Sequence, residues 1–266
     1  MTSLVKPTLG TDPKTGWRFY SLHLTSSYVL KEFFLVSYYR RCIENAFDYD
    51  KKTKDNIAII EKLKGSVADK DPILASAEDL SKWAKEMNSQ NYHELYVHSF
   101  MGMWSSFETG LENTIADFVQ HDYEVAKTLI GKFKSGRYEI SNWPWNRSTC
   151  LEIANKIENK SKDATKDVSL DLFARIQTMF SWLGIYIKME DKERNYLAEA
   201  NRVRNILLHR YGEISEEDAL YFPSLSKWVG AVMPFNKEIF TNYYDSIIKT
   251  LIAVMNGIQE KTKNKT

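Results

Sequence analysis

The sequence predicts an all-α fold, and three of its properties favour this class. Its 266 residues include only 11 glycines and 6 prolines, so residues that form turns are scarce. Apolar side chains recur at steps of three and four residues over long stretches, which is the period of an amphipathic helix. The composition, with 43% hydrophobic and 27% charged residues, is that of a folded protein long enough to bury a core.

Helices are expected from the first third of the chain onward. Residues 26–47 are rich in aromatic side chains and are interpreted as a helix, although their aromatic and β-branched content also suits a strand. Two shorter helices are expected at 55–64 and 72–87. The second of them has Pro72 in its first turn and Asp71 as its cap.

A longer helix is expected to begin near Tyr92. It carries an apolar stripe that must be buried, formed by Phe100, Met103, Trp104, Phe107, Leu111, Ile115 and Phe118. A shorter helix at 123–133 precedes the strongest loop signal of the chain, residues 134–147, where Gly, Ser, Trp and Pro gather. Helix is expected again from about Ser148.

The remaining segments extend the helical pattern to the C-terminal end. Residues 156–166 are polar and charged without an apolar period, so a solvated helix end and a loop are expected there. The helical period returns over 169–187 and 192–210, and Gly212 is expected to cap the second of these helices. A last helix is expected from about residue 234 to 260, ahead of a basic tail.

Charge and cysteine content exclude several classes of protein. The 36 basic and 35 acidic residues give a net charge of +1, which argues against broad coating of nucleic acid but allows a local basic site. No apolar run approaches the roughly 20 residues that span a bilayer, so a membrane protein is not expected. Cys42 and Cys150 fit no disulfide or metal-ligand spacing and are interpreted as reduced thiols of a cytoplasmic protein.

One segment is a candidate for a functional site. It is the run Arg-Val-Arg-Asn-Ile-Leu-Leu-His-Arg-Tyr-Gly at 202–212. It places three arginines and a histidine within nine residues at the end of an amphipathic helix. Guanidinium groups stabilise phosphate charge, and an imidazole titrates near neutral pH. This combination suits phosphate chemistry.

The segment resembles the signature of the HEPN superfamily, an all-helical group in which many members are metal-independent endoribonucleases. That signature is an Arg, usually followed by a polar residue, and a His after four to six intervening positions, as in Arg204, Asn205 and His209. An acidic residue in an earlier helix, Glu108, and a glycine soon after the histidine also match. The resemblance covers roughly residues 92–260. It implies a HEPN-type helical domain at 91–266, preceded by an N-terminal helical extension at 1–90 of unknown role.

The resemblance also implies an activity, in which RNA is cut by its own 2′-hydroxyl without a metal or another cofactor. His209 would act as general acid or base, Arg204 would stabilise the scissile phosphate, Asn205 would position the motif, and Glu108 would orient the Arg or the His. Arg202 and Arg210 would bind substrate. The implied setting is a toxin or antiviral-defence protein that acts on RNA as a homodimer, with an antitoxin as a partner.

Helix geometry leaves the choice of arginine open. At about 100° per residue, Asn205 and Arg202 share a face with His209, whereas Arg204 points about 140° away from it. Arg202 also fits the signature, with six intervening positions. The polar residue after Arg204 favours that arginine by resemblance, and the geometry favours Arg202.

Other interpretations of the same residues also stay open. His209 is also consistent with a cation at a helix C-terminus, the arginines with a solvated face, and Glu108 with a surface carboxylate. The alternative functions are a non-catalytic HEPN module that binds RNA or a nucleotide or dimerises, and an all-helical scaffold protein.

Overall fold

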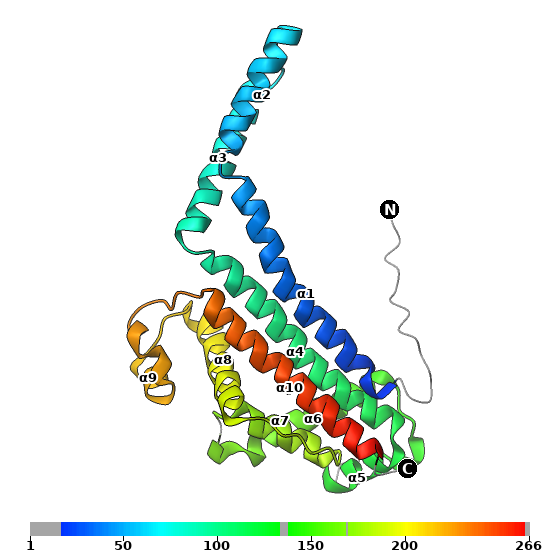
Figure 1. The fold of residues 1–266 in the computed structure, drawn as a ribbon. Helices are drawn as coiled ribbons and strands as arrows, with labels where there is room; N and C mark the ends of the chain where they lie inside the picture. The colour runs from blue at the N-terminus through cyan, green and yellow to red at the C-terminus, as the bar shows by residue number, and fades with distance from the viewer. Residues whose placement is uncertain (1–16, 134–137, 169, 264–266) are drawn as a thin grey trace. The chain divides into compact units, whose positions relative to one another are not determined.

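The protein is all-α, as the sequence predicts. The computed structural model describes residues 17–133, 138–168 and 170–263. Every regular element in these ranges is a helix, and none is a strand (Figure 1). The α-helices are α1 (Trp17–Asn45), α2 (Tyr49–Lys64), α3 (Lys70–Ser89), α4 (His93–His121), α5 (Tyr123–Phe133), α6 (Arg147–Ala164), α7 (Leu172–Trp182), α8 (Asp191–Arg210), α9 (Glu216–Tyr221) and α10 (Lys237–Lys263). Short 3₁₀ helices lie at Ile140–Asn142, Lys166–Val168 and Pro223–Trp228.

Several expected boundaries are wrong. The helices expected from residues 26 and 55 begin at Trp17 and Tyr49, and the N-cap of α3 is Asp69 rather than Asp71, which lies within the helix. The expected helix end within 156–166 is instead helical as far as Ala164, because Ile157 and Ser161 are buried and continue the inner face of α6. The helix expected to reach residue 187 ends at Trp182. Gly184 follows with a φ of +71°, which lies in the left-handed region that favours glycine.

The segment after α7 is extended rather than helical. Ile185 and Ile187 are buried while Tyr186 between them is 70% exposed, which is the alternation of an extended chain. Helix α10 passes close to this segment. A Cβ at Gly257 would lie 2.6 Å from the carbonyl oxygen of Tyr186, so only glycine fits there.

The described residues form two compact units, and α1, α4 and α10 each contribute to both. Unit 1 comprises residues 1–30, 102–233 and 241–266, and unit 2 comprises residues 31–101 and 234–240. The first fourteen described residues, 17–30, therefore pack within unit 1. The expected division near residue 90 stays a prediction.

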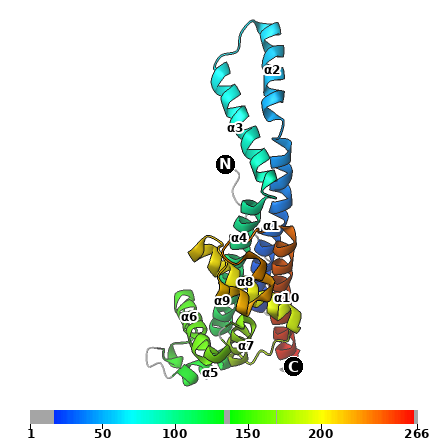
Figure 2. The same cartoon turned by 90° about the vertical axis from the view of Figure 1, so that its left-hand side faces the viewer.

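In unit 1 the helices α1, α4 and α10 run side by side, as Figures 1 and 2 show. Helix α4 approaches α1 closely at Gly110, where an added Cβ would be 1.9 Å from Oγ1 of Thr25 and 2.6 Å from its Cβ. The unit 1 part of the predicted α4 stripe, from Met103 to Phe118, is buried. This confirms the prediction of a core-facing stripe.

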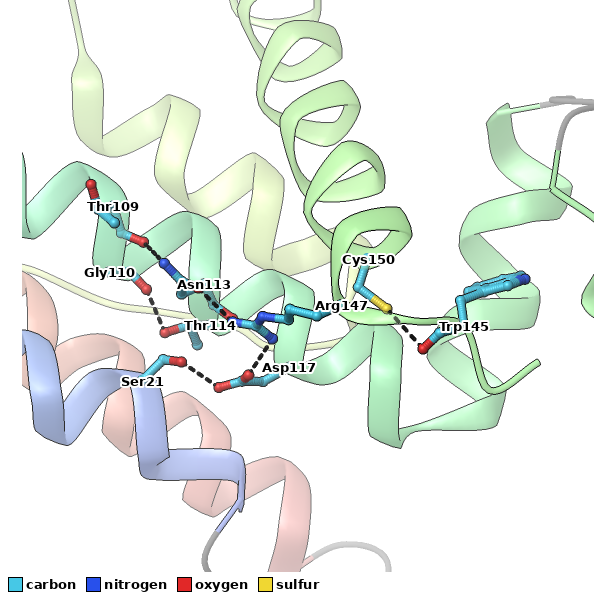
Figure 3. A network of polar contacts seen from close by, with 9 residues as sticks. All are labelled: Ser21, Thr109, Gly110, Asn113, Thr114, Asp117, Trp145, Arg147 and Cys150. Carbon is cyan, nitrogen blue, oxygen red and sulfur yellow. Dashed lines mark hydrogen bonds and ion pairs between the residues drawn. The ribbon is translucent and has the colours of Figure 1, made fainter. Parts of the chain in front are cut away.

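A polar network ties α1, α4 and α6 together within unit 1 (Figure 3). The buried carboxylate of Asp117 accepts a hydrogen bond of 2.5 Å from the hydroxyl of Ser21 and forms an ion pair of 2.6 Å with Arg147. Arg147 also donates to Oδ1 of Asn113 at 2.5 Å. Nearby, the thiol of Cys150 is buried and lies 3.7 Å from the carbonyl oxygen of Trp145. Burial raises the pKa of this thiol.

Unit 2 contains the antiparallel pair of α2 and α3. Its aromatic contacts include a stacked pair formed by Phe33 and Phe240, with ring centroids 5.7 Å apart. The ring of His93 accepts a hydrogen bond of 2.8 Å at Nδ1 from the backbone N–H of Phe235. Apolar side chains on α2 and α3 stay exposed, among them Leu63 and Trp83.

No helix within the described ranges is long and apolar enough to cross a lipid bilayer.

Replacing Gly110 by alanine should destabilise the protein. The added methyl group overlaps the β-branched side chain of Thr25, so the backbones of α1 and α4 must separate. The expected loss is about 1–3 kcal/mol in the free energy of unfolding, measured by urea denaturation. Gly131→Ala in α5 is the matched control, because no heavy atom lies within 4 Å of its added Cβ. That variant should gain about 0.5–1 kcal/mol, and equal effects of the two substitutions would contradict the close approach.

Candidate functional site

Helix α8, which carries the motif, has charged ends that complement its dipole and one buried apolar face. Its first turn is acidic, with Asp191 and Glu193, and its last turn is basic, with His209 and Arg210, so both ends complement the helix dipole. Leu197, Ala200, Val203 and Ile206 are buried at steps of three residues. The helix ends at Tyr211, whose φ of 53° is left-handed, and Gly212 follows with a φ of 91°. The cap therefore lies one residue before the glycine expected to provide it.

Three of the site residues predicted from the sequence lie together. A terminal nitrogen of Arg204 on α8 forms an ion pair of 2.7 Å with Oε2 of Glu108 on α4. The other terminal nitrogen donates to Oδ1 of Asn205 at 2.9 Å. Both partners of the ion pair are partly exposed, so the pair contributes little to stability, and its main effect is to hold the guanidinium in one orientation.

The other two arginines of the motif converge on a buried carboxylate, that of Asp218 in α9. Nε of Arg202 lies 2.5 Å from Oδ1 of Asp218, and a terminal nitrogen of Arg210 lies 2.6 Å from Oδ2. Ser215 completes the arrangement as a capping box at the start of α9. The predicted role of Arg202 and Arg210 in binding substrate stays a prediction, but both guanidiniums have an internal partner.

The surroundings of Asp218 lower the pKa of its carboxyl group. Burial by itself would raise the pKa of this carboxyl group. Hydrogen bonds from the backbone N–H and hydroxyl of Ser215 and from the guanidiniums of Arg202 and Arg210 outweigh that effect. Together they lower the pKa from its ordinary value of 3.8 to about 2.

The side chain of His209 is not linked to the other predicted site residues by a hydrogen bond or an ion pair. Its side chain is exposed, and it forms neither a hydrogen bond nor an ion pair with any other described residue. The helical step from Arg204 to His209 turns by about 140°, so the two side chains leave α8 in different directions. Within one chain, Arg204 is grouped with Glu108 and Asn205, and His209 is not.

Arg204 lines a cavity of about 340 Å³ in unit 1. Side chains from α4, α6, α7 and α8 surround it, and six of them are charged: Glu108, Glu112, Glu158, Lys162, Arg175 and Arg204. Arg175 is not among the site residues predicted from the sequence. One signal for it was present, because Arg175 follows Leu172 by three residues and precedes Met179 by four, which places a charge beside the apolar face of α7.

The cavity offers two arginine side chains to a ligand. Two guanidiniums border the cavity, and a guanidinium fork matches the oxygens of a phosphate. Within the described part of the chain, no group of three or more His, Cys, Asp or Glu side chains is arranged to hold a metal ion.

Asp218→Asn should remove a stability contribution that depends on pH. Because the folded pKa lies below the unfolded one, the contribution is complete above pH 4 and disappears as the pH falls through about 2. The shift of 3.8 to about 2 corresponds to about 2 kcal/mol. Denaturant unfolding at pH 6 should show this loss in Asp218→Asn, and the difference from the unsubstituted protein should narrow between pH 4 and 2. A difference that is independent of pH would contradict the assignment.

Comparisons with known proteins give no relative for this chain: no family model matches it, and neither a curated protein nor a solved structure is significantly similar to it.

Proposed function

We propose that the protein is a metal-independent endoribonuclease of the HEPN type, acting as a toxin or antiviral-defence effector. The observation that carries this proposal is the contact of Arg204 with both Glu108 and Asn205. These three residues were predicted together from their resemblance to a nuclease signature. Glu108 is 96 positions from Arg204, so their meeting is not a consequence of local helix geometry.

The proposed reaction uses the 2′-hydroxyl of the RNA as the nucleophile. His209 accepts the proton of that hydroxyl, and the oxygen attacks the adjacent phosphorus. The bond to the 5′-oxygen of the next nucleotide breaks, and this oxygen takes up a proton, leaving a 2′,3′-cyclic phosphate and a free 5′-hydroxyl. Arg204 stabilises the negative charge that grows on the phosphate oxygens, while Glu108 holds its guanidinium in place.

A second chain would complete the site. Arg204 and His209 leave α8 in directions about 140° apart, so one helix does not present both to the same phosphate. A two-fold axis between two copies of α8 brings Arg204 of one chain toward His209 of the other. The proposed enzyme is therefore a homodimer with two composite sites.

His209→Ala should reduce RNA cleavage by roughly 10²- to 10⁴-fold while the helical circular-dichroism signal is kept, because it removes the proton-transferring group. The matched control is His98→Ala, which removes another exposed histidine, on α4, and should cleave like the unsubstituted protein. The assay contains millimolar EDTA, because the proposed chemistry needs no metal. Unchanged cleavage by His209→Ala would reject the site. RNA binding without any cleavage by the unsubstituted protein would favour the non-catalytic alternative.

Complementation between inactive variants tests the composite site. His209→Ala and Arg204→Ala are each expected to be inactive alone, but a mixed dimer contains one site with both residues intact. An equimolar mixture should recover about a quarter of the full activity, since half of the dimers are mixed and each has one of two sites. Arg202→Ala serves as the comparison for Arg204→Ala and should lose less activity. Failure of the mixture to recover activity would contradict a shared site.

A further inference from the structure

The guanidinium of Arg175 on α7 lacks hydrogen-bond acceptors among the described residues, and the proposed reaction gives it no role. Its side chain is half-buried, yet it makes no hydrogen bond and no ion pair with any described residue. Its Nε is fully enclosed without an acceptor. Buried donors are paired in the great majority of native proteins, so an unpaired guanidinium indicates an acceptor that binds from outside the chain.

The location of Arg175 identifies where that acceptor binds. Arg175 lines the same cavity as Arg204, and its two terminal nitrogens, unlike Nε, are accessible. Nε of Arg204 is likewise enclosed without an acceptor. The cavity volume of about 340 Å³ lies at the lower end of the range for small-molecule sites and is far larger than one water molecule needs.

Most of the charged side chains around the cavity are paired with one another. Glu108 is paired with Arg204, and Glu158 is paired with Lys162 at 2.9 Å. Two charged side chains of the lining, Arg175 and Glu112, form neither an ion pair nor a side-chain hydrogen bond with another described residue.

The surroundings of Glu112 and Arg175 shift the pKa of each group. Burial, reinforced by the charge of Glu158, raises the pKa of Glu112, and the charge of Arg147 acts in the opposite direction. Burial lowers the pKa of Arg175, the charges of Glu158 and Glu108 raise it, and the charge of Arg204 lowers it. A guanidinium stays protonated in proteins, so Arg175 brings a positive charge with unused hydrogen-bond donors to the cavity.

We infer that Arg175 is a second phosphate-binding guanidinium beside Arg204, and that the cavity lined by α4, α6, α7 and α8 holds a phosphate of a bound nucleotide. Arg202 and Arg210, the arginines closest to Arg204 in sequence, are engaged by Asp218. Arg175 is instead free to bind substrate. This assignment extends the proposed function by naming a substrate-binding residue, but binding of phosphate at the cavity does not require that RNA is cleaved there.

Equilibrium binding of inorganic phosphate and of adenosine 3′-monophosphate tests the assignment. Both probes are titrated calorimetrically into the intact protein at a constant ionic strength of about 0.15 M. Arg175→Gln should weaken the binding of both probes by about 10- to 100-fold, the effect of removing a charge-assisted hydrogen bond. Arg41→Gln is the matched control, because it removes an exposed arginine outside the cavity and should bind as the unsubstituted protein does.

A stability measurement separates a binding role from a structural one. If Arg175 exists to bind phosphate, Arg175→Met should unfold at the same or a higher denaturant concentration, because an unpaired, half-buried charge is replaced by an apolar side chain. A clear loss of stability in Arg175→Met would overturn the assignment. So would equal phosphate affinity of Arg175→Gln and the unsubstituted protein, no phosphate binding at all, or acetate binding as tight as that of phosphate.

The same titration distinguishes this inference from the proposed function. An unsubstituted protein that binds adenosine 3′-monophosphate through Arg175 but leaves RNA intact supports the phosphate site and rejects the nuclease. A protein that cleaves RNA equally well with and without Arg175, and binds the nucleotide equally well, keeps the nuclease and rejects the phosphate site.

Discussion

The arrangement of arginines around α8 depends on one buried carboxylate, that of Asp218. It accepts bonds from Arg202 and Arg210 while it also caps α9 with Ser215. One side chain therefore fixes both the end of the motif-bearing helix and the short helix that follows it. Because Arg202 and Arg210 are bound there, Arg204 alone among the three arginines of the motif is directed toward α4. Asp218, which lies outside the motif, therefore determines which arginines are bound internally and which one contacts α4.

The long helices could be predicted because their apolar period persists over several turns. The stripe on α4 from Phe100 to Phe118 is buried as expected, and α5 and α8 begin and end within one residue of the expected positions. Helix boundaries were predicted wrongly where only a few residues carry the apolar period. Ile157 and Ser161 alone continue the buried face of α6, and a serine does not register as apolar. At 183–187 the apolar residues alternate, which is the period of an extended chain and not of a helix.

The candidate site could be predicted only in part. The meeting of Arg204 with Glu108 followed from resemblance, since no local rule connects residues 96 positions apart. The capping box at Ser215 and Asp218 has a recognisable spacing, but nothing in that spacing says that two arginines from another helix converge on it. The spacing of Arg175 on α7 is only a weak signal, and the packing of α4, α6 and α7 is needed to show that its Nε is enclosed without an acceptor. Such an absence of partners is a three-dimensional property and has no linear signature.

The two cysteines differ in a way that has a practical consequence for chemical labelling. Cys42 on α1 is exposed and belongs to unit 2, whereas Cys150 on α6 is buried in unit 1 with a raised thiol pKa. A thiolate is the reactive species, so a maleimide reagent near neutral pH modifies Cys42 and leaves Cys150 intact while the protein is folded. A single fluorophore is thus placed in unit 2 of the natural sequence without any substitution. Reaction at Cys150 would then signal that the buried surroundings of this thiol have opened.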